Sequence, residues 1–366
     1  MIQRIVLGTL TALTLLTAEA GARFDIGTAA AASGSRDAAT APAASNAADR
    51  DGSHAHRATD GLIRRAVDAA HDAFVPEARV IAIDAALIGD QLLVPLELDG
   101  TNVVLRLEPF TVRGDGFVVR AVGVDGSTAL VAPPAPRTWR GSVDGMAGAV
   151  CAATWHDGRL HATIRLSDGE TWQVQPAGAD LRAPGGEGLF TPHLLYRWSE
   201  VLPDEHGCGV PVDALNMPLA EAAGPGGVAG DEPCNVTCKV AIAADVEYYL
   251  ANDSSIETVV ADIESVMNAV SLIYGVDVSI SYSITAIVVY TDEPDGLEAT
   301  DPEKLLYEFQ AAWIEEPIER DVAHLMTGRN LDGTVIGMAF FSGVCNEENG
   351  FGLSQSQYST HFAKRV

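Results

Sequence analysis

The stretch KVAIAADVEYYLANDSSIETVVADIESVMNAVSLIYGVDVSISYSITAIVVY, residues 239–290, decides the fold class of the second half of the chain. Its first residues, 239–244, form a short apolar run that is typical of a buried strand. Residues 276–290 are rich in β-branched side chains and predict a second strand. Between the two, apolar residues recur at helical spacing: Ile256, Val259, Val260, Ile263, Val266, Met267, Val270 and Ile273. This order indicates a parallel pair of strands, because the helix supplies the crossover that parallel strands need.

The sequence also predicts where the helices begin and end. Ser254 and Glu257 form a capping box ahead of the first helix, and Gly275 is expected to end it. Asp301-Pro302 predicts the start of a second helix, and Pro317 is expected to end that one.

Two further strands are expected at 322–326 and 335–341, so residues 234–366 predict a mixed, mostly parallel sheet with helices. Residues 62–175 instead show short strand-like runs separated by Asp-Gly pairs. These pairs are Asp99-Gly100, Asp115-Gly116, Asp125-Gly126, Asp157-Gly158 and Asp168-Gly169. Asp-Gly readily adopts the positive φ of a tight hairpin turn, so this part predicts an antiparallel β domain. The expected fold class is α+β.

Composition excludes several functions. The chain has 366 residues, with 23 Lys and Arg against 50 Asp and Glu, and a formal net charge of −27. This charge disfavours binding to nucleic acid and to anionic lipid, so we expect no nucleic-acid partner. The sequence contains no phosphate loop, no dinucleotide-binding glycine fingerprint and no Gly-x-Ser-x-Gly elbow.

The N-terminus has the features of an export signal. One positive charge precedes the apolar run 5–17, and Ala18-Glu19-Ala20 offers small residues at cleavage spacing, so residues 1–20 are expected to be a signal peptide. The protein is then secreted or in the cell envelope. Residues 21–61 are rich in Ala, Ser and Asp and are expected to be disordered. The Gly- and Pro-rich residues 217–233 predict a linker. No later run is expected to span a membrane.

Five cysteines are present: Cys151, Cys208, Cys234, Cys238 and Cys345. In an exported protein disulfides persist, and an odd count leaves at least one thiol without an internal partner. The spacing of Cys234 and Cys238 resembles one arm of a zinc knuckle, although no second arm follows.

Three stretches of the sequence resemble one family. The first is Trp139-Arg140-Gly141-Ser142-Val143, followed by Gly169-Glu170-Thr171-Trp172-Gln173-Val174 and His193-Leu194-Leu195-Tyr196-Arg197. It resembles the propeptide of the reprolysin or ADAM-like (metzincin) zinc metallopeptidases. The second, His206-Gly207-Cys208-Gly209-Val210, is similar to the cysteine-switch motif of that family. The third, residues 325–340 with Val344-Cys345, resembles the stretch that leads to its catalytic helix, and residues 240–249 resemble its first strand.

The resemblance implies a secreted zinc metalloendopeptidase precursor, with a propeptide domain at 62–216 and the N-terminal part of the catalytic domain at 234–366. It implies zinc as the cofactor, a peptide or protein substrate, and an activating protease that cuts the linker. In this family the motif His-Glu-x-x-His-x-x-Gly-x-x-His follows at about the point where this sequence stops. Three zinc ligands and a glutamate base are needed to activate water, so we expect no catalytic residue in this chain and no activity from it. His324 lies in a strand pattern and His361 is followed by Phe362, so neither replaces the motif.

The resemblance also assigns roles to residues that are present. Cys208 is expected to place its thiolate on the zinc of an intact relative; a disulfide or an inert thiol are the alternatives. Val335, Ile336, Gly337, Met338 and Ala339 are expected to form the edge strand that pairs with an extended substrate. Many members bind calcium through an acidic residue on the first strand, but the matching position here is Lys239, which makes calcium doubtful. Cys345 would pair with a cysteine beyond the active-site helix.

Two other functions stay open at this stage. The chain could be a non-catalytic secreted protein that uses the metzincin scaffold for binding or inhibition. It could also be an acidic envelope protein with an unrelated α/β domain. If residues 234–366 lack the helix that covers one face of the sheet, they should expose apolar side chains and aggregate.

Overall fold

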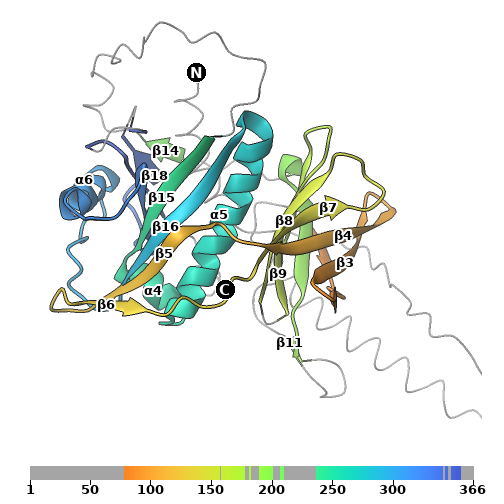
Figure 1. Cartoon of the computed structure of the whole chain (residues 1–366), viewed down its shortest axis with the longest axis horizontal. Helices are drawn as coiled ribbons and strands as arrows, with labels where there is room; N and C mark the ends of the chain where they lie inside the picture. Colours follow the sequence, from red (N-terminus) through yellow and green to blue (C-terminus); the bar gives the residue numbers. More distant parts are fainter. Residues whose placement is uncertain are drawn as a thin grey trace, which may run out of the picture.

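The computed structural model describes residues 78–156, 158–177, 181–182, 189–200, 207–209, 236–340, 343–344 and 348–355. Within them lie a nine-stranded and an eight-stranded sheet (Figure 1). The α+β class predicted from the sequence agrees with this content. The expected signal peptide 1–20, the segment 21–61, the linker 217–233, Cys234, Cys345 and His361 lie outside the described residues.

The first sheet is antiparallel throughout, with the strand order β1-β13-β10-β9-β8-β7-β4-β3-β2. Its strands are β1 (Arg79–Ile81), β2 (Ala86–Ile88), β3 (Gln91–Leu98), β4 (Thr101–Phe110), β7 (Thr138–Val143), β8 (Val150–His156), β9 (Arg159–Arg165), β10 (Thr171–Pro176) and β13 (His193–Arg197). The predicted Asp-Gly turn between β3 and β4 has φ 49° at Asp99 and φ 74° at Gly100, which is the geometry of a tight hairpin. A short pair, β11 (Leu181–Arg182) and β12 (Leu189–Phe190), lies apart, and the 3-10 turn η2 (Trp198–Glu200) follows β13.

The second sheet is mixed and mostly parallel, with the order β14-β18-β19-β17-β15-β16-β5-β6. Its strands are β5 (Arg113–Val122), β6 (Thr128–Val131), β14 (Gly207–Gly209), β15 (Val236–Ala244), β16 (Ile280–Tyr290), β17 (Val322–Thr327), β18 (Val335–Ala339) and β19 (Phe351–Gln355). Three of these strands, β5, β6 and β14, come from the part of the chain before residue 216. The predicted antiparallel domain therefore contributes strands to the sheet of the other half.

Three helices accompany the second sheet: α4 (Val246–Ala251), α5 (Ile256–Val278) and α6 (Pro302–Trp313). The N-terminal cap of α5 is Ser255, whose side chain accepts a hydrogen bond from Thr258 N, so the predicted capping box at Ser254 is wrong by one residue. The helix also continues past Gly275 and ends at Val278, with Ser279 as its C-cap at φ 57°. A glycine inside a helix costs only about 1 kcal/mol, and the packing of a long helix outweighs that cost. The strand predicted from residue 276 consequently begins at 280.

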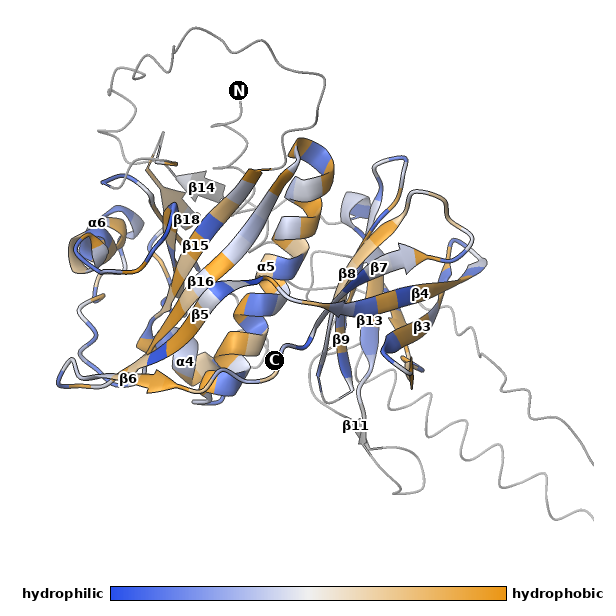
Figure 2. Ribbon diagram, viewed as in Figure 1, coloured by the Kyte–Doolittle hydropathy of each residue, from blue (hydrophilic) through white to orange (hydrophobic). Residues whose placement is uncertain are grey.

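Helices cover both faces of the second sheet. Helix α5 packs on one face with β15, β16 and β5, where Val119, Val240, Ile242 and Ile287 are fully buried. Helix α6 packs on the other face against β18 and β19, where Leu305, Leu306, Phe309 and Trp313 belong to a core cluster that also includes residues of β15 and β17. Figure 2 shows apolar residues concentrated on these strands and along α5. The expectation of an uncovered apolar face is therefore wrong within the described residues.

Helix α5 lies between the two sheets (Figure 1). By length and composition it could also cross a membrane, which corrects the expectation that no later run meets those criteria. In the fold, however, 67% of its most apolar window is buried. Polar residues Glu264, Asn268 and Ser271 are buried on it as well, and they bind the neighbouring strands. This is the environment of a core helix.

Candidate active-site edge

Strand β18 has a neighbour on each side. On one side it runs antiparallel to β19, with Gly337 opposite Ser354. On the other side it runs parallel to β14, where Cys208 pairs with Gly337 and Gly209 pairs with Met338. An added Cβ at Gly209 would lie 2.6 Å from Met338 Cε and 3.2 Å from Val335 Cγ1, so a glycine lets β14 approach this closely.

The structure thus brings together two predicted site elements that are far apart in the sequence. The backbone of the predicted switch motif, residues 207–209, lies along the strand predicted to bind substrate, Val335 to Ala339. The side chain of Cys208 is outside the described part of the structure, so its role on zinc stays a prediction. The prediction that Val335 to Ala339 form the edge of the sheet is wrong, because β14 pairs with β18 and is itself the edge strand. The substrate-binding role of β18 stays a prediction.

The described histidines do not form a zinc site. His324 on β17 is 4% exposed, its Nε2 lies 3.0 Å from Ser354 Oγ, and burial lowers its pKa to about 4. His193 accepts a hydrogen bond from Leu160 N and bonds Thr191 O through its other ring nitrogen. His156 and His161 lie on β8 and β9 of the first sheet. The histidines of the described part do not fit the three-ligand set that catalytic zinc needs.

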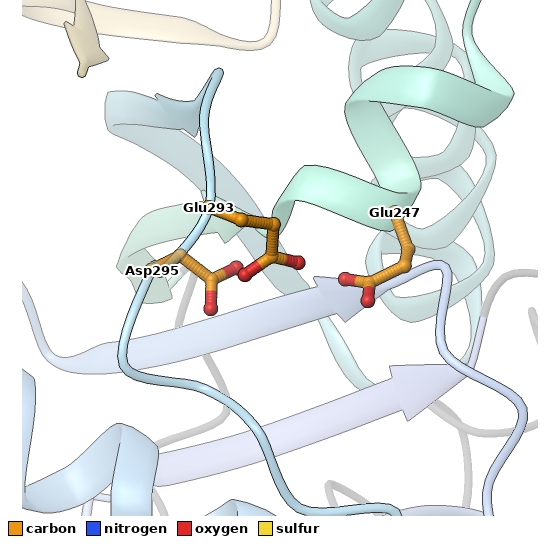
Figure 3. A group of neighbouring side chains, drawn as sticks. All are labelled: Glu247, Glu293 and Asp295. Carbon is orange, nitrogen blue, oxygen red and sulfur yellow. The ribbon is translucent and has the colours of Figure 1, made fainter. Parts of the chain in front are cut away.

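A cluster of carboxylates lies at the carboxyl ends of the parallel strands, and the sequence reasoning did not predict it. Glu247 lies in the first turn of α4, just after β15, while Glu293 and Asp295 follow β16. One carboxylate oxygen from each of the three lies within 4.8 Å of the others (Figure 3). Arg329, which follows β17, forms ion pairs with all three carboxylates. Its guanidinium lies 2.9 Å from Glu247, 3.3 Å from Glu293 and 3.8 Å from Asp295.

Asp245 is a buried carboxylate next to this cluster. Its side chain is fully buried and accepts hydrogen bonds from Tyr248 N, as the N-cap of α4, and from Gly328 N. Desolvation, opposed by these bonds, raises the pKa of Asp245 to about 6. Partial burial, together with the charge of Asp245, raises the pKa of Glu247 to about 7. Asp245 and Glu247 therefore take up protons at a higher pH than ordinary carboxyl groups do.

Close backbone packing holds the loop after β17 in place. An added Cβ at Gly328 would lie 2.3 Å from Glu247 C and 2.4 Å from Tyr248 N. Only glycine fits there, and it allows the Gly328 N–H to reach Asp245. Arg329 and the chain leading into β18 are thereby fixed against α4.

Lys239, the position matched to a calcium-binding acid, is paired as a cation. Its ammonium forms an ion pair with Glu319, and its backbone N donates to Asp321 Oδ2 at 2.7 Å. The hydrogen bond to Glu319 raises the pKa of Lys239. The lysine supplies positive charge next to these two carboxylates, where the resemblance would place a calcium ion.

Comparison with known proteins finds similarity to one family of peptidases. Residues 235–365 match the reprolysin model of metallo-peptidase family M12. The predicted resemblance of this part of the chain to the reprolysin/ADAM-like metallopeptidases is confirmed. Human disintegrin and metalloproteinase domain-containing protein 33 is 24% identical over 276 residues, which cover 72% of this chain and 33% of that protein. The chain spans about a third of the length of this relative.

Proposed function

We propose that this chain is the N-terminal part of a secreted zinc metalloendopeptidase precursor that is latent because its own strand β14 covers the substrate edge. The pairing of β14 with β18, inside a domain that matches family M12, supports this proposal. An extended peptide binds a sheet edge through backbone N–H and C=O groups. Strand β14 uses those groups of β18, so a substrate and β14 would compete for one edge.

Hydrolysis would need groups that the described residues lack. Zinc, when bound by three protein ligands, would lower the pKa of a water molecule and polarise the peptide carbonyl. The role of this chain's own residues would be to align the peptide along β18, with Cys208 as the candidate thiolate of the switch. We therefore expect the 366-residue chain to be inactive by itself.

The test compares two lengths of the protein. The reading frame beyond Val366 is sequenced, and the longest product it encodes is expressed next to the 366-residue chain. A His-Glu-x-x-His motif and chelator-sensitive casein cleavage by the longer product alone are expected. A continued frame without this motif, or casein digestion by the 366-residue chain, would contradict the proposal.

The alternative is a non-catalytic binding or inhibitory protein on the same scaffold. The observation that favours it concerns His324, the one histidine among the described residues from 236 onward. This imidazole is buried and hydrogen-bonded to Ser354, so it is not placed to bind zinc. Stoichiometric zinc in the purified longer product, measured by mass spectrometry of the metal, would exclude this alternative.

A further inference from the structure

The part of the chain before residue 216 holds both edges of the second sheet, but by very different means. At one edge β14 contributes three residues, and its register with β18 shifts between Gly207 and Cys208. At the other edge β5 pairs with β16 from Arg113 to Val122, and β6 then pairs with β5.

Strand β5 is integrated into the core of the second sheet. Val119 is fully buried beside α5, together with Val112 just before the strand. Backbone bonds lie at both ends of the pairing, from Ile284 N to Val112 O at 2.8 Å and from Thr291 N to Val122 O at 2.9 Å. Two buried valines and backbone bonds at both ends tie β5 to the second sheet, so we expect the strand to stay paired while that sheet is folded.

The chain enters and leaves β5 and β6 from strands that are themselves paired. Strand β4 ends at Phe110 and β7 begins at Thr138, and these two residues lie opposite each other in the first sheet. The segment 111–137 is therefore held at both of its ends by the pairing of β4 with β7 in the first sheet. Within the segment, β5 pairs with β16 of the second sheet (Figure 1).

Arginines of the same part of the chain bind α5. Arg113 forms an ion pair with Glu264, and Arg137 forms one with Glu257. Arg140 donates to the side-chain and backbone oxygens of Asn268 at 2.7 and 2.8 Å. These contacts add to the strand pairing and are independent of β14.

We propose that one cut in the 217–233 segment leaves the N-terminal part bound through β5 and α5 and leaves β14 on β18. This inference deepens the proposed function, because it concerns the latency of the same edge. Strand β14 stays tethered to β13, which ends at Arg197, ten residues before Gly207. A short tether to a body that remains bound keeps the strand at a high effective concentration at its site, so cutting the other tether changes little. Uncovering β18 would then need removal of β14 itself.

The experiment uses the full chain with a site-specific protease sequence in place of Gly224–Gly227. After complete cleavage the fragments are run on size exclusion at physiological salt, and hydrogen exchange is measured before and after. We expect the two fragments to co-elute, with β16 and β18 amides protected as in the uncut chain. Separate elution, or loss of protection in β18 after the single cut, would overturn the inference.

A variant supplies the positive control for the exchange measurement. Gly209→Val should unseat β14 and increase exchange in β18, while β16 stays protected and the cut fragments still co-elute. The same exchange at Gly275, where an added Cβ meets only Ile280 O at 4.0 Å, is the matched control and should leave β18 protected. If Gly209→Val leaves β18 as protected as the control does, β14 does not cover the edge and the inference fails. None of these readouts requires peptidase activity, so an inactive longer product would defeat the proposed function without changing them.

Discussion

The ion pair between Arg113 on β5 and Glu264 on α5 allows a quantitative test of how firmly the two halves of the chain are joined. The exposed fractions are 12% for the Arg113 side chain and 2% for Glu264, and the guanidinium also lies 4.8 Å from the centre of the Phe117 ring. Arg113→Met keeps most of the apolar packing but leaves a buried carboxylate without its partner. Breaking a buried pair on one side costs about 3–5 kcal/mol, whereas replacing both partners with apolar residues is often close to neutral.

We therefore expect Arg113→Met to lower the free energy of unfolding by about 3–5 kcal/mol. The double variant Arg113→Met/Glu264→Met should recover most of that loss. Urea denaturation followed by circular dichroism, on both variants and on Glu264→Met alone, gives the coupling energy of the cycle. A coupling energy below about 0.5 kcal/mol, which is the scatter expected for independent sites, would refute this reasoning.

The same variant has a predictable pH dependence. Desolvation raises the pKa of Glu264, while Arg113 and Arg137 lower it. Removing Arg113 raises the pKa further, so the folded variant holds its proton more tightly than the unfolded chain does. Stability gained in this way is present at low pH and is lost as the pH rises through the raised pKa. The deficit of Arg113→Met should accordingly be smaller at acid pH than at alkaline pH.

Three further perturbations probe the carboxyl ends of the strands and the Lys239 pair. Arg329→Met should lower the free energy of unfolding by about 3 kcal/mol near pH 8, because it leaves a partly buried carboxylate cluster without its positively charged partner. The loss should be smaller at pH 5, where Glu247 is protonated. Thermal melts that show equal losses at the two pH values would contradict this. Gly328→Ala should lower the free energy of unfolding, measured by urea denaturation, by about 3 kcal/mol, because the added Cβ overlaps backbone atoms of α4. A loss below about 1 kcal/mol, as for surface substitutions, would contradict this prediction. Lys239→Glu places a third carboxylate beside Glu319 and Asp321, so millimolar calcium should raise the melting temperature of the variant and leave the wild type unchanged. A variant insensitive to calcium would show that these carboxylates do not form a calcium site.

The sequence predicted most elements of the second sheet but not which strands are neighbours. Periodicity identified β15, α5, β16, α6, β17 and β18, because each has a long or well-bounded apolar pattern. Strand β5 was identified as a strand, yet nothing in its alternation distinguishes a partner in the first sheet from β16. Strand pairing over such separations is decided by packing, which a local pattern does not record. Helix α4 is not predicted because six residues are too few to show helical periodicity, and β19 is not predicted because its sequence, FGLSQ, lacks a continuous apolar run.

The acidic cluster could have been found from the sequence with one further step. Asp245 follows the first predicted strand and residues 292–295 follow the second, both after apolar runs. The carboxyl ends of parallel strands meet at one edge, so polar residues placed there are brought together. Arg329 is harder to place from the sequence, because no strand or helix pattern distinguishes it from a surface arginine. Its role depends on burial and on distances to three separate segments.

The parallel pairing of β5 with β16 also has a consequence for biosynthesis. Val119 and Ile287 lie opposite each other but are about 170 residues apart in the chain. At about 5–20 residues per second, the ribosome delivers the partner of β5 roughly ten to thirty seconds later. During that interval β5 is exposed in the nascent polypeptide without its partner strand β16. We expect molecular chaperones to be needed most at this stage of synthesis.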